Sequence, residues 1–457
     1  MMREMDGSSS SSSSKGDNDN SKSNSSSSNN IRLFERAAKQ MVKGVNSPIR
    51  YFEPYPFFVK RARGCRVYDV DGNSYIDYCM GYGALLLGHV FKDVIDDVKA
   101  QLSRGSLYCM PTEHEVELAE LLSRCIPCAE MIRLLNTGME ATYHAIRIAR
   151  AYTKRRKIIK FDGCYHGSHD YTLVKSYASM DEMLSSAMLE GVASNTIILP
   201  YNDIDAVRDA MQKVGSDVAA IIVEPVMANA GLIPPSNGFL ETLSSICKEY
   251  GSLLIFDEVV TGFRLALGGA QEYYNIKPDI ATFAKAMANG FPIACIAGIR
   301  DVMSVLAPEG MLYQGSTFAG NPVCVTAAIA TIRYLMRHRS IYKLMEKRCN
   351  ELVSMISDMV RDNGIEARIN SIASMFQIFF TSNEVRDYAT ARLSNTTLFK
   401  SYFNGLLKQG VFIPPSQFEV CFLSLAHDDT IIRSTGEKIG RVLARELRRG
   451  VEVTGRE

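Results

Sequence analysis

The sequence has 457 residues, of which 46% are hydrophobic and 22% charged, and its formal net charge at pH 7 is +1. This length predicts two or three domains with a large buried core, and the near-neutral charge argues against a dedicated nucleic-acid binder. Charges, glycines or prolines interrupt every apolar run before the roughly 18 residues that a membrane-spanning helix needs. We therefore expect neither nucleic acid nor a membrane as a partner.

The first 30 residues differ from the rest, because Ser and Asn dominate them and a Ser run covers residues 8–14. Such a segment has too little apolar surface to form a core, so we predict that residues 1–30 are disordered. A transit peptide would be rich in Arg and poor in acids, whereas this segment carries Glu4, Asp6, Asp17 and Asp19. We expect a cytoplasmic protein.

Eleven cysteines are scattered between Cys65 and Cys421. An odd number without a secretory signal argues against a disulfide framework and indicates a reducing compartment. The CxxC pair of Cys125 and Cys128 lacks the second pair, or the His pair, that a zinc site would need. We interpret both as small core residues at the end of a helix, and we expect no metal site.

Residues 31–85 are predicted to form the N-terminal segment of a smaller domain. Within this segment, residues 66–78 alternate apolar and polar side chains on both sides of a turn, Asp71-Gly72-Asn73. Period-two alternation around such a turn predicts two antiparallel strands joined as a hairpin.

Residues 86–332 are predicted to form a large α/β domain, because short β-branched runs alternate there with helical patterns. A capping box at Thr112 opens a helix that reaches about Arg124, and a second helix covers residues 140–150. Several strands are apolar almost throughout, as expected of a mostly parallel sheet that helices cover on both faces. The predicted strands are residues 157–161, 196–200, 218–224, 253–257, 280–284 and 293–299.

Residues 333–457 are predicted to complete a smaller α+β domain together with the N-terminal segment. They contain a long amphipathic helix from about Arg333, then alternating segments, and a basic helix over residues 437–449. The fold class is therefore α/β, with a mostly parallel central sheet and a second domain built from both ends of the chain.

Two polar residues follow apolar strands of the large domain. Asp257 ends the strand at 253–257, and Lys285 follows the strand at 280–284. Because ligands bind outside the carboxyl ends of strands in such sheets, both side chains could face one crevice. An apolar pocket would lower the pKa of the lysine and make it a nucleophile, while the acid could pair with a protonated ring nitrogen. A strand-end cap and a surface lysine are the alternatives.

Two turns could complete such a site. Residues 134–141 pass from a strand through Gly138 into a helix, which predicts an anion site at free backbone N–H groups. An ordinary helix cap at Asn136 or Thr137 is the alternative. Residues 161–167 follow another strand and place Tyr165 where its ring could cover a flat cofactor, or where it could pack on the core.

Together these residues resemble the class III aminotransferases of the pyridoxal-phosphate (PLP) fold type I, from about residue 31 to 449. The resemblance rests on DEV at 257–259, Lys285, YHG at 165–167 and GNP at 320–322. Within that class, the sequence is similar to the glutamate-1-semialdehyde 2,1-aminomutase group. This finer resemblance rests on GVNSPIR (44–50), FDEVVTGFR (256–264), LGGAQ (267–271), YQ (313–314) and PSQFEV (415–420).

The resemblance implies that Lys285 is the catalytic residue, which binds the cofactor covalently and moves protons. The other cofactor-binding residues that it implies are Thr137, Gly138 and Met139 at the phosphate, Tyr165, His166 and Val259 around the ring, Asp257 at the pyridine nitrogen, Asn229 at the phenolic oxygen, and Thr317 from a neighbouring subunit. A homodimer with shared sites follows from that last residue. The implied substrate-binding residues are Ser47 and Arg50 at the carboxylate, Tyr82 in the pocket wall and Glu419 at the amino end.

The resemblance implies a PLP-dependent enzyme whose cofactor alternates between PLP and pyridoxamine phosphate. Our first hypothesis is the aminomutase reaction, which yields 5-aminolevulinate for tetrapyrrole biosynthesis. Three residues depart from the group's pattern: Met139 replaces a hydroxyl residue at the phosphate turn, Tyr82 stands where a Trp is expected, and Tyr177 replaces a Gly in a loop followed by a helical pattern at 181–189. They keep open a second hypothesis, an aminotransferase of the same subgroup that acts on a β- or D-amino acid with a 2-oxo acid acceptor.

Overall fold

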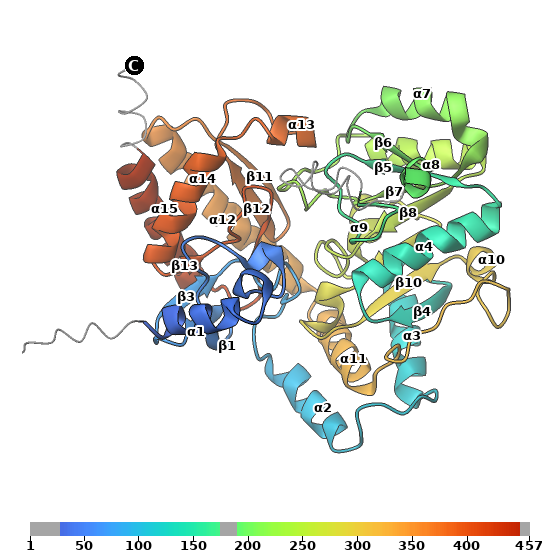
Figure 1. The fold of residues 1–457 in the computed structure, drawn as a ribbon, viewed down its shortest axis with the longest axis horizontal. Coiled ribbons are helices and arrows are strands. Elements are labelled where there is room, and N and C mark those ends of the chain that lie inside the picture. The colour runs from blue at the N-terminus through green and yellow to red at the C-terminus, as the bar shows by residue number, and fades with distance from the viewer. Residues whose placement is uncertain (1–27, 174–189, 448–457) are drawn as a thin grey trace, which may run out of the picture.

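The computed structural model describes residues 28–173 and 190–447, whose strands form sheets of seven, four and three strands. Figure 1 shows the seven-stranded sheet and its helices on one side of the molecule and the smaller sheets on the other. The expected fold class is confirmed. Tyr177 and the helical pattern at 181–189 lie outside the described residues. No helix in the described ranges is long and apolar enough to cross a membrane.

The large sheet is parallel at its centre and antiparallel at one edge. In spatial order its strands are β4 (Met131–Leu135), β10 (Ala294–Gly298), β9 (Ile280–Phe283), β8 (Leu253–Asp257), β7 (Val218–Val223), β5 (Lys157–Phe161) and β6 (Thr196–Leu199). The strands from β9 to β6 pair in parallel, whereas β10 runs antiparallel to both β9 and β4. Every residue of β7 to β10 is buried, as expected for strands covered on both faces. All six predicted strands are present within one residue at each end.

Helices cover both faces of this sheet (Figure 1). They are α2 (Lys92–Leu102), α3 (Glu113–Cys125), α4 (Gly138–Thr153), α6 (Glu190–Ala193), α7 (Ile204–Val214), α8 (Phe239–Tyr250), α9 (Gly269–Tyr274), α10 (Arg300–Met303) and α11 (Pro322–Arg337). α4 packs on β7 to β10, α8 packs on β7 and β8, and α11 packs on α2 and α3. The capping box predicted at Thr112 is present at the start of α3, and Thr137 forms another at the start of α4.

The smaller part of the molecule combines both ends of the chain. Its four-stranded sheet contains β1 (Val59–Arg63), β2 (Arg66–Asp69), β3 (Ser74–Asp77) and β13 (Val411–Phe412), and its three-stranded sheet contains β11 (Arg368–Ile372), β12 (Met375–Phe379) and β14 (Cys421–Phe422). The predicted hairpin is the antiparallel pair β2–β3, and β13 adds to it in parallel. The helices are α1 (Asn29–Ala38), α12 (Ser340–Asp362), α13 (Tyr388–Ala391), α14 (Thr396–Lys408) and α15 (Asp429–Val442), which continues as a π-helical turn, Leu443–Leu447.

Three helices differ from the expected boundaries. The long amphipathic helix expected from about Arg333 is α12, which begins at Ser340, because Arg333 still belongs to α11. α1 begins inside the Ser/Asn-rich segment, where the buried Asn30 donates from Nδ2 to Oδ2 of Asp69 at 3.0 Å; residues 1–27 lie outside the described range. α15 begins before residue 437, because the Asp428 side chain accepts a hydrogen bond from the Ile431 N–H and caps the helix there.

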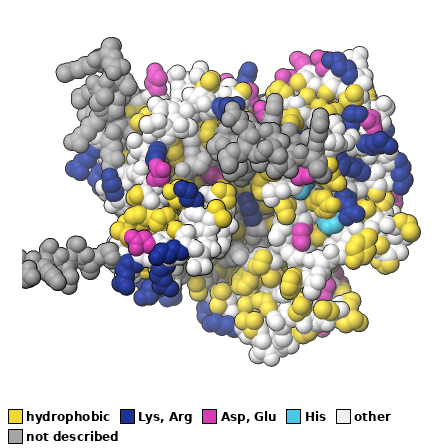
Figure 2. All heavy atoms as spheres, in the orientation of Figure 1, with side chains coloured by type: hydrophobic (Ala, Val, Ile, Leu, Met, Phe, Trp, Pro, Cys, Tyr) yellow, Lys and Arg dark blue, Asp and Glu magenta, His cyan; other side chains and the backbone are white. Residues whose placement is uncertain are grey.

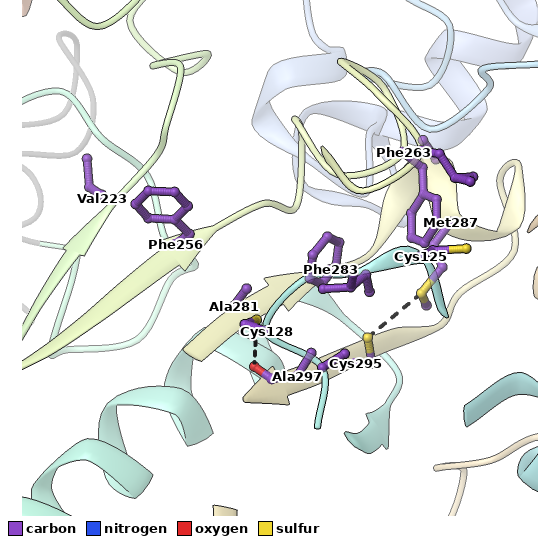
Figure 3. Close-up of a cluster of buried hydrophobic side chains, with 14 of the residues drawn as sticks. Cys125, Cys128, Val223, Phe256, Phe263, Ala281, Phe283, Met287, Cys295 and Ala297 are labelled. Carbon is purple, nitrogen blue, oxygen red and sulfur yellow. Dashed lines mark hydrogen bonds between the residues drawn. The ribbon is translucent and has the colours of Figure 1, made fainter. Parts of the chain in front are cut away.

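The CxxC cysteines lie in the core of the large part (Figure 3). Cys125 is the last residue of α3, and burial raises the pKa of its thiol to about 11. The Cys128 thiol donates to the Ala297 carbonyl at 3.8 Å, and the neighbouring Cys295 thiol lies 3.9 Å from Sδ of Met287. Cys125 and Cys128 are therefore small core side chains at a helix end, as interpreted from the sequence, and burial favours the protonated form of both thiols.

Candidate active site

A cavity of about 350 Å³ opens where the two parts of the molecule meet. Residues just past β5, β7, β8 and β9 line it together with the start of α4, at the strand ends where ligands bind in such sheets. Four further residues, Ile49, Gly81, Tyr82 and Glu419, reach it from the smaller part. The lining residues are Ile49, Gly81, Tyr82, Gly138, Met139, Thr142, Tyr165, His166, Gly167, Glu224, Asn229, Asp257, Val259, Val260, Ala284, Lys285 and Glu419.

Asp257 is the last residue of β8, and three donors fix its carboxylate. Nδ1 of His166 donates to Oδ2 at 2.7 Å, while the Thr282 hydroxyl and the Val259 N–H donate to Oδ1 at 3.2 and 3.1 Å. Nε2 of His166 is buried and has no hydrogen-bond partner among the described residues. The sequence predicted a strand-end acid facing the crevice, and the structure adds a buried Asp–His pair.

Lys285 lies two residues past β9 and lines the same cavity as Asp257. Its backbone is left-handed, with a φ of 44°, an uncommon and strained conformation for a residue other than glycine. Burial lowers the pKa of its ammonium group, and the nearby Glu419, Glu224 and Asp257 oppose this effect. The structure therefore brings together the amine and the carboxylate that the sequence placed at one crevice.

Glu224 is a buried acid just past β7 that the sequence analysis missed. Its Oε1 accepts the Tyr165 N–H at 2.9 Å, and its Oε2 accepts the Ala228 N–H at 2.8 Å and Nδ2 of Asn229 at 3.0 Å. Burial raises the pKa of Glu224. One side chain thus orients both Tyr165 and Asn229. The available signal was its position, because Glu224 directly follows a buried strand, at the same carboxyl edge of the sheet where Asp257 ends β8.

The predicted anion turn is present, and one of its residues is a cap. The Thr137 hydroxyl accepts the Glu140 N–H and caps α4, so Thr137 does not line the cavity, whereas Gly138 and Met139 do. A Cβ added at Gly138 would lie 2.8 Å from Cγ2 of Val259. Close packing of α4 on the segment after β8 therefore requires a glycine at this turn.

The substrate-side residues divide into two groups. Tyr82 and Glu419 line the cavity, and the Tyr82 hydroxyl donates to the Ile49 carbonyl at 2.6 Å. Burial raises the pKa of the Glu419 carboxyl to about 7. Ser47 precedes the short helix η2 (Pro48–Arg50), and Arg50 is its last residue, next to Ile49. Neither Ser47 nor Arg50 lines the cavity, and Arg50 is exposed.

Thr317 lies on a second hollow of about 390 Å³, outside the main cavity. This hollow is lined by Leu107, Tyr108, Cys109, Met110, Pro111, Thr112, Glu115, Ser316, Thr317, Ala319, Gly320 and Pro322. Large apolar side chains are exposed around it, among them Met110 and Phe318. Figure 2 shows hydrophobic side chains gathered on the lower part of that view, in the region of α2.

Comparisons with known proteins agree with this geometry. A model of the family described as "Aminotransferase class-III" matches residues 50–428. A glutamate-1-semialdehyde 2,1-aminomutase of Methanocaldococcus jannaschii is 50% identical over 406 residues, which cover 88% of this chain and 95% of that protein. A protein of the same name from Nitrosopumilus maritimus is 51% identical over 412 residues, covering 89% of this chain and 97% of that one.

The fold also has close counterparts among solved structures. An omega-transaminase from Sphaerobacter thermophilus has a TM-score of 0.87 and 31% identity, and the match covers 93% of this chain and 99% of that chain. The arrangement of both parts around the cavity is therefore shared with a transaminase.

Proposed function

We propose that this chain, which belongs to the class-III aminotransferase family and depends on pyridoxal 5′-phosphate, acts as a glutamate-1-semialdehyde 2,1-aminomutase. The observation that carries the proposal is that Lys285 and the hydrogen-bonded Asp257 line one cavity in a chain about half identical to proteins of that name over most of its length. The net reaction moves an amino group between neighbouring carbons of one molecule and yields 5-aminolevulinate. This product would serve tetrapyrrole biosynthesis.

The residues of the cavity fit the cofactor. Its lining contains an amine for a covalent link at Lys285, a fixed carboxylate for a ring nitrogen at Asp257, and backbone N–H groups at the start of α4 for a phosphate. Gly138 leaves the space beside Val259 that a larger residue would fill. The buried Nε2 of His166, which lacks a partner among the described residues, lies in the same wall.

Bound pyridoxal 5′-phosphate supplies an electron sink for charge that develops on the substrate carbon. Lys285 serves as the nucleophile and proton carrier, because its lowered pKa leaves more of the amine neutral than in water. Asp257 would hold the ring nitrogen protonated, and His166 keeps that carboxylate in one orientation. When the cofactor is bound, Tyr165 and Val259 would cover the two faces of its ring, and Asn229 would reach its phenolic oxygen.

Glu224 supports these roles from within the cavity wall. Its carboxylate accepts from the Tyr165 backbone and the Asn229 side chain, so both groups keep one position relative to each other. On the substrate side, Ser47 and Arg50 bind the carboxylate, with the planar guanidinium suited to two parallel hydrogen bonds. Tyr82 forms part of the pocket wall, and Glu419 faces the amino end.

A homodimer completes the site in this proposal. Thr317 is exposed on the second hollow and reaches no group of its own cavity, which supports a role at the phosphate site of a second copy. The exposed Met110, Met311, Tyr313 and Phe318 supply an apolar surface of the kind that stable interfaces bury. The scattered, mostly buried cysteines support a cytoplasmic location.

Product analysis tests the aminomutase proposal. The purified protein is given glutamate 1-semialdehyde alone, and we expect 5-aminolevulinate to form without any oxo acid. The spent mixture is assayed for both compounds, with and without 2-oxoglutarate. Strict dependence on the added acceptor would reject the aminomutase reaction.

The second candidate is an aminotransferase of the same subgroup that acts on a β- or D-amino acid with a 2-oxo acid acceptor. Tyr82 favours it, because its hydroxyl donates a hydrogen bond to the Ile49 carbonyl. The Tyr side chain in this position gives the cavity wall a shape different from that of a Trp. The structural likeness to an omega-transaminase also favours it. Acceptor-dependent release of an oxo acid in the same assay would support this candidate.

A further inference from the structure

Glu419 reaches the cavity from the segment 417–419, in which each backbone carbonyl accepts a hydrogen bond. The Gln417 and Glu419 carbonyls accept hydrogen bonds from Nε2 of Gln377 at 2.7 and 2.5 Å. The Phe418 carbonyl between them accepts the Gly231 N–H at 2.7 Å. Each of these three successive carbonyls therefore has a donor, and the Gln377 side chain supplies the donor for two of them.

Gln377 lies on β12 and is completely buried. The contact is reciprocal, because Nε2 of Gln417 donates to the Ile378 carbonyl at 2.7 Å. Gly231 allows the close approach of the third donor, since its φ is +81° and an added Cβ would lie 2.4 Å from the Phe379 ring. The segment is thus attached to β12 and to the loop that carries Asn229.

The Glu419 carboxyl lies in a crowded electrostatic environment. Lys285 and Glu224 face it from the large part, and its charge in turn affects Tyr82, Tyr165 and Cys79. A small displacement would therefore change both its distance from Lys285 and its exposure to water. Because backbone carbonyls in the interior need donors, removing the Gln377 amide would free the segment to move toward water.

We propose that Gln377 is a positioning residue that holds the Glu419 carboxyl inside the cavity, where Glu419 selects a substrate by its amino group. The selection step rests on the proposed function, whereas the positioning step is measurable without turnover. Gln377 has no contact with the cavity itself and acts only through the segment 417–419.

The test compares Gln377→Met with Asn370→Leu. Both changes replace an amide by an apolar group of similar size, and both remove two hydrogen bonds to backbone carbonyls, since Nδ2 of Asn370 donates to Leu232 and Val385. The two residues are cross-strand partners on β11 and β12. They differ in that Gln377 contacts the segment 417–419 directly and Asn370 does not, and in that Gln377→Met also removes the Oε1 acceptor of the Ile378 N–H. Asn370→Leu therefore controls for the loss of two amide–carbonyl hydrogen bonds elsewhere in the same strand pair.

Glu419 ionisation is measured in the cofactor-loaded full chain by infrared titration, using the protonated-carboxyl band that Glu419→Gln removes. We expect the midpoint to fall by at least about one pH unit in Gln377→Met, because a freed carboxyl gains water. The midpoint should stay at its wild-type value in Asn370→Leu. The apparent KM for the amino substrate should rise about tenfold in Gln377→Met, with a smaller change in kcat.

An unmoved midpoint in a folded Gln377→Met protein would overturn the positioning role, as would an equal shift in Asn370→Leu. If Gln377→Met does not fold, Gln377→Asn replaces it, because the shorter amide stays polar but cannot reach both carbonyls. The same fall in midpoint is then expected, and its absence rejects the proposal. A shifted midpoint with an unchanged KM would leave Gln377 as a positioning residue and reject substrate selection by Glu419.

Discussion

Three acids and one amine line the cavity, and their hydrogen bonds give each acid a different role. Asp257 accepts three hydrogen bonds that hold it for a ring nitrogen. The Glu224 carboxylate accepts hydrogen bonds from the loops that carry Tyr165 and Asn229. Glu419 keeps a carboxyl whose pKa burial raises to about 7, close to the amine of Lys285. Because the three acids have different partners, replacing any one of them should affect a different property of the site.

Replacement of Lys285 by Ala should lower turnover by at least about a hundredfold, because it removes the nucleophile and proton carrier. The fold should persist, since the side chain faces the cavity and fills no core volume. Steady-state rates and a thermal melt of the variant check both parts. Turnover within tenfold of the wild type would contradict the assigned role.

Glu419 should make the protein less stable as the pH rises from about 4.5 to 7. The unfolded chain loses this proton near the ordinary value of 4.5, whereas the folded protein keeps it until about 7. The contribution is thus fully present below 4.5 and lost by 7. Glu419→Gln removes this part of the pH dependence, about 3 kcal/mol. Denaturant unfolding at several pH values measures it. Glu249→Gln, an exposed control on α8, should leave the slope unchanged.

At the scale of elements, the site is built where β8 and α4 approach each other. The turn before α4 has a Thr137 capping box, and Gly138 follows it against the Val259 side chain. Backbone N–H groups at this helix start are thereby brought next to the residues that follow Asp257. This contact depends on the distance between α4 and the segment that follows β8, and neither element could set that distance alone.

Gly138→Ala should weaken cofactor binding by at least about tenfold and cost roughly 1–3 kcal/mol of stability, because the new Cβ overlaps Val259 and pushes α4 away from β8. Absorbance titration with pyridoxal 5′-phosphate gives the Kd, and chemical denaturation gives the stability. Gly191→Ala is the matched control, since an added Cβ there meets nothing within 4 Å. Equal Kd values for the two variants would rule out this explanation.

At the scale of the whole molecule, the second hollow and its apolar rim remain uncovered in one chain. Phe318 is 58% exposed beside Thr317, and Leu393 in the smaller part is 61% exposed. Only the first of these belongs to the proposed interface between copies. Substitution of the two by the same charged residue therefore separates an effect on assembly from a general effect on solubility.

Phe318→Asp should shift the protein from dimer to monomer and reduce activity together with cofactor affinity, because a buried charge opposes association and Thr317 then leaves the partner's site. Leu393→Asp should change neither property. Analytical ultracentrifugation over a range of concentrations reports the assembly state. A monomeric wild-type protein with full activity would contradict the shared site.

Local patterns in the sequence were enough to predict most of the elements and the main chemical groups of the site. Apolar runs that end in polar residues located β8 with Asp257 and β9 with Lys285, because buried parallel strands need continuous apolar side chains and ligands bind at their carboxyl ends. The capping boxes and the hairpin turn were equally local signals. Each of these features depends on residues within a few positions of one another, so spacing alone is informative.

Which distant residues act together could be seen only in the folded chain. Glu224 orients Tyr165, and Gln377 holds the segment of Glu419, across 59 and 42 positions of sequence. Two further features could not be predicted from local patterns. They are the antiparallel pairing of β10 and the exposure of Arg50 and Thr317. A hydrogen bond between separated segments depends on how sheets and loops pack, and packing energy is shared among many residues, so no local pattern in the chain encodes it.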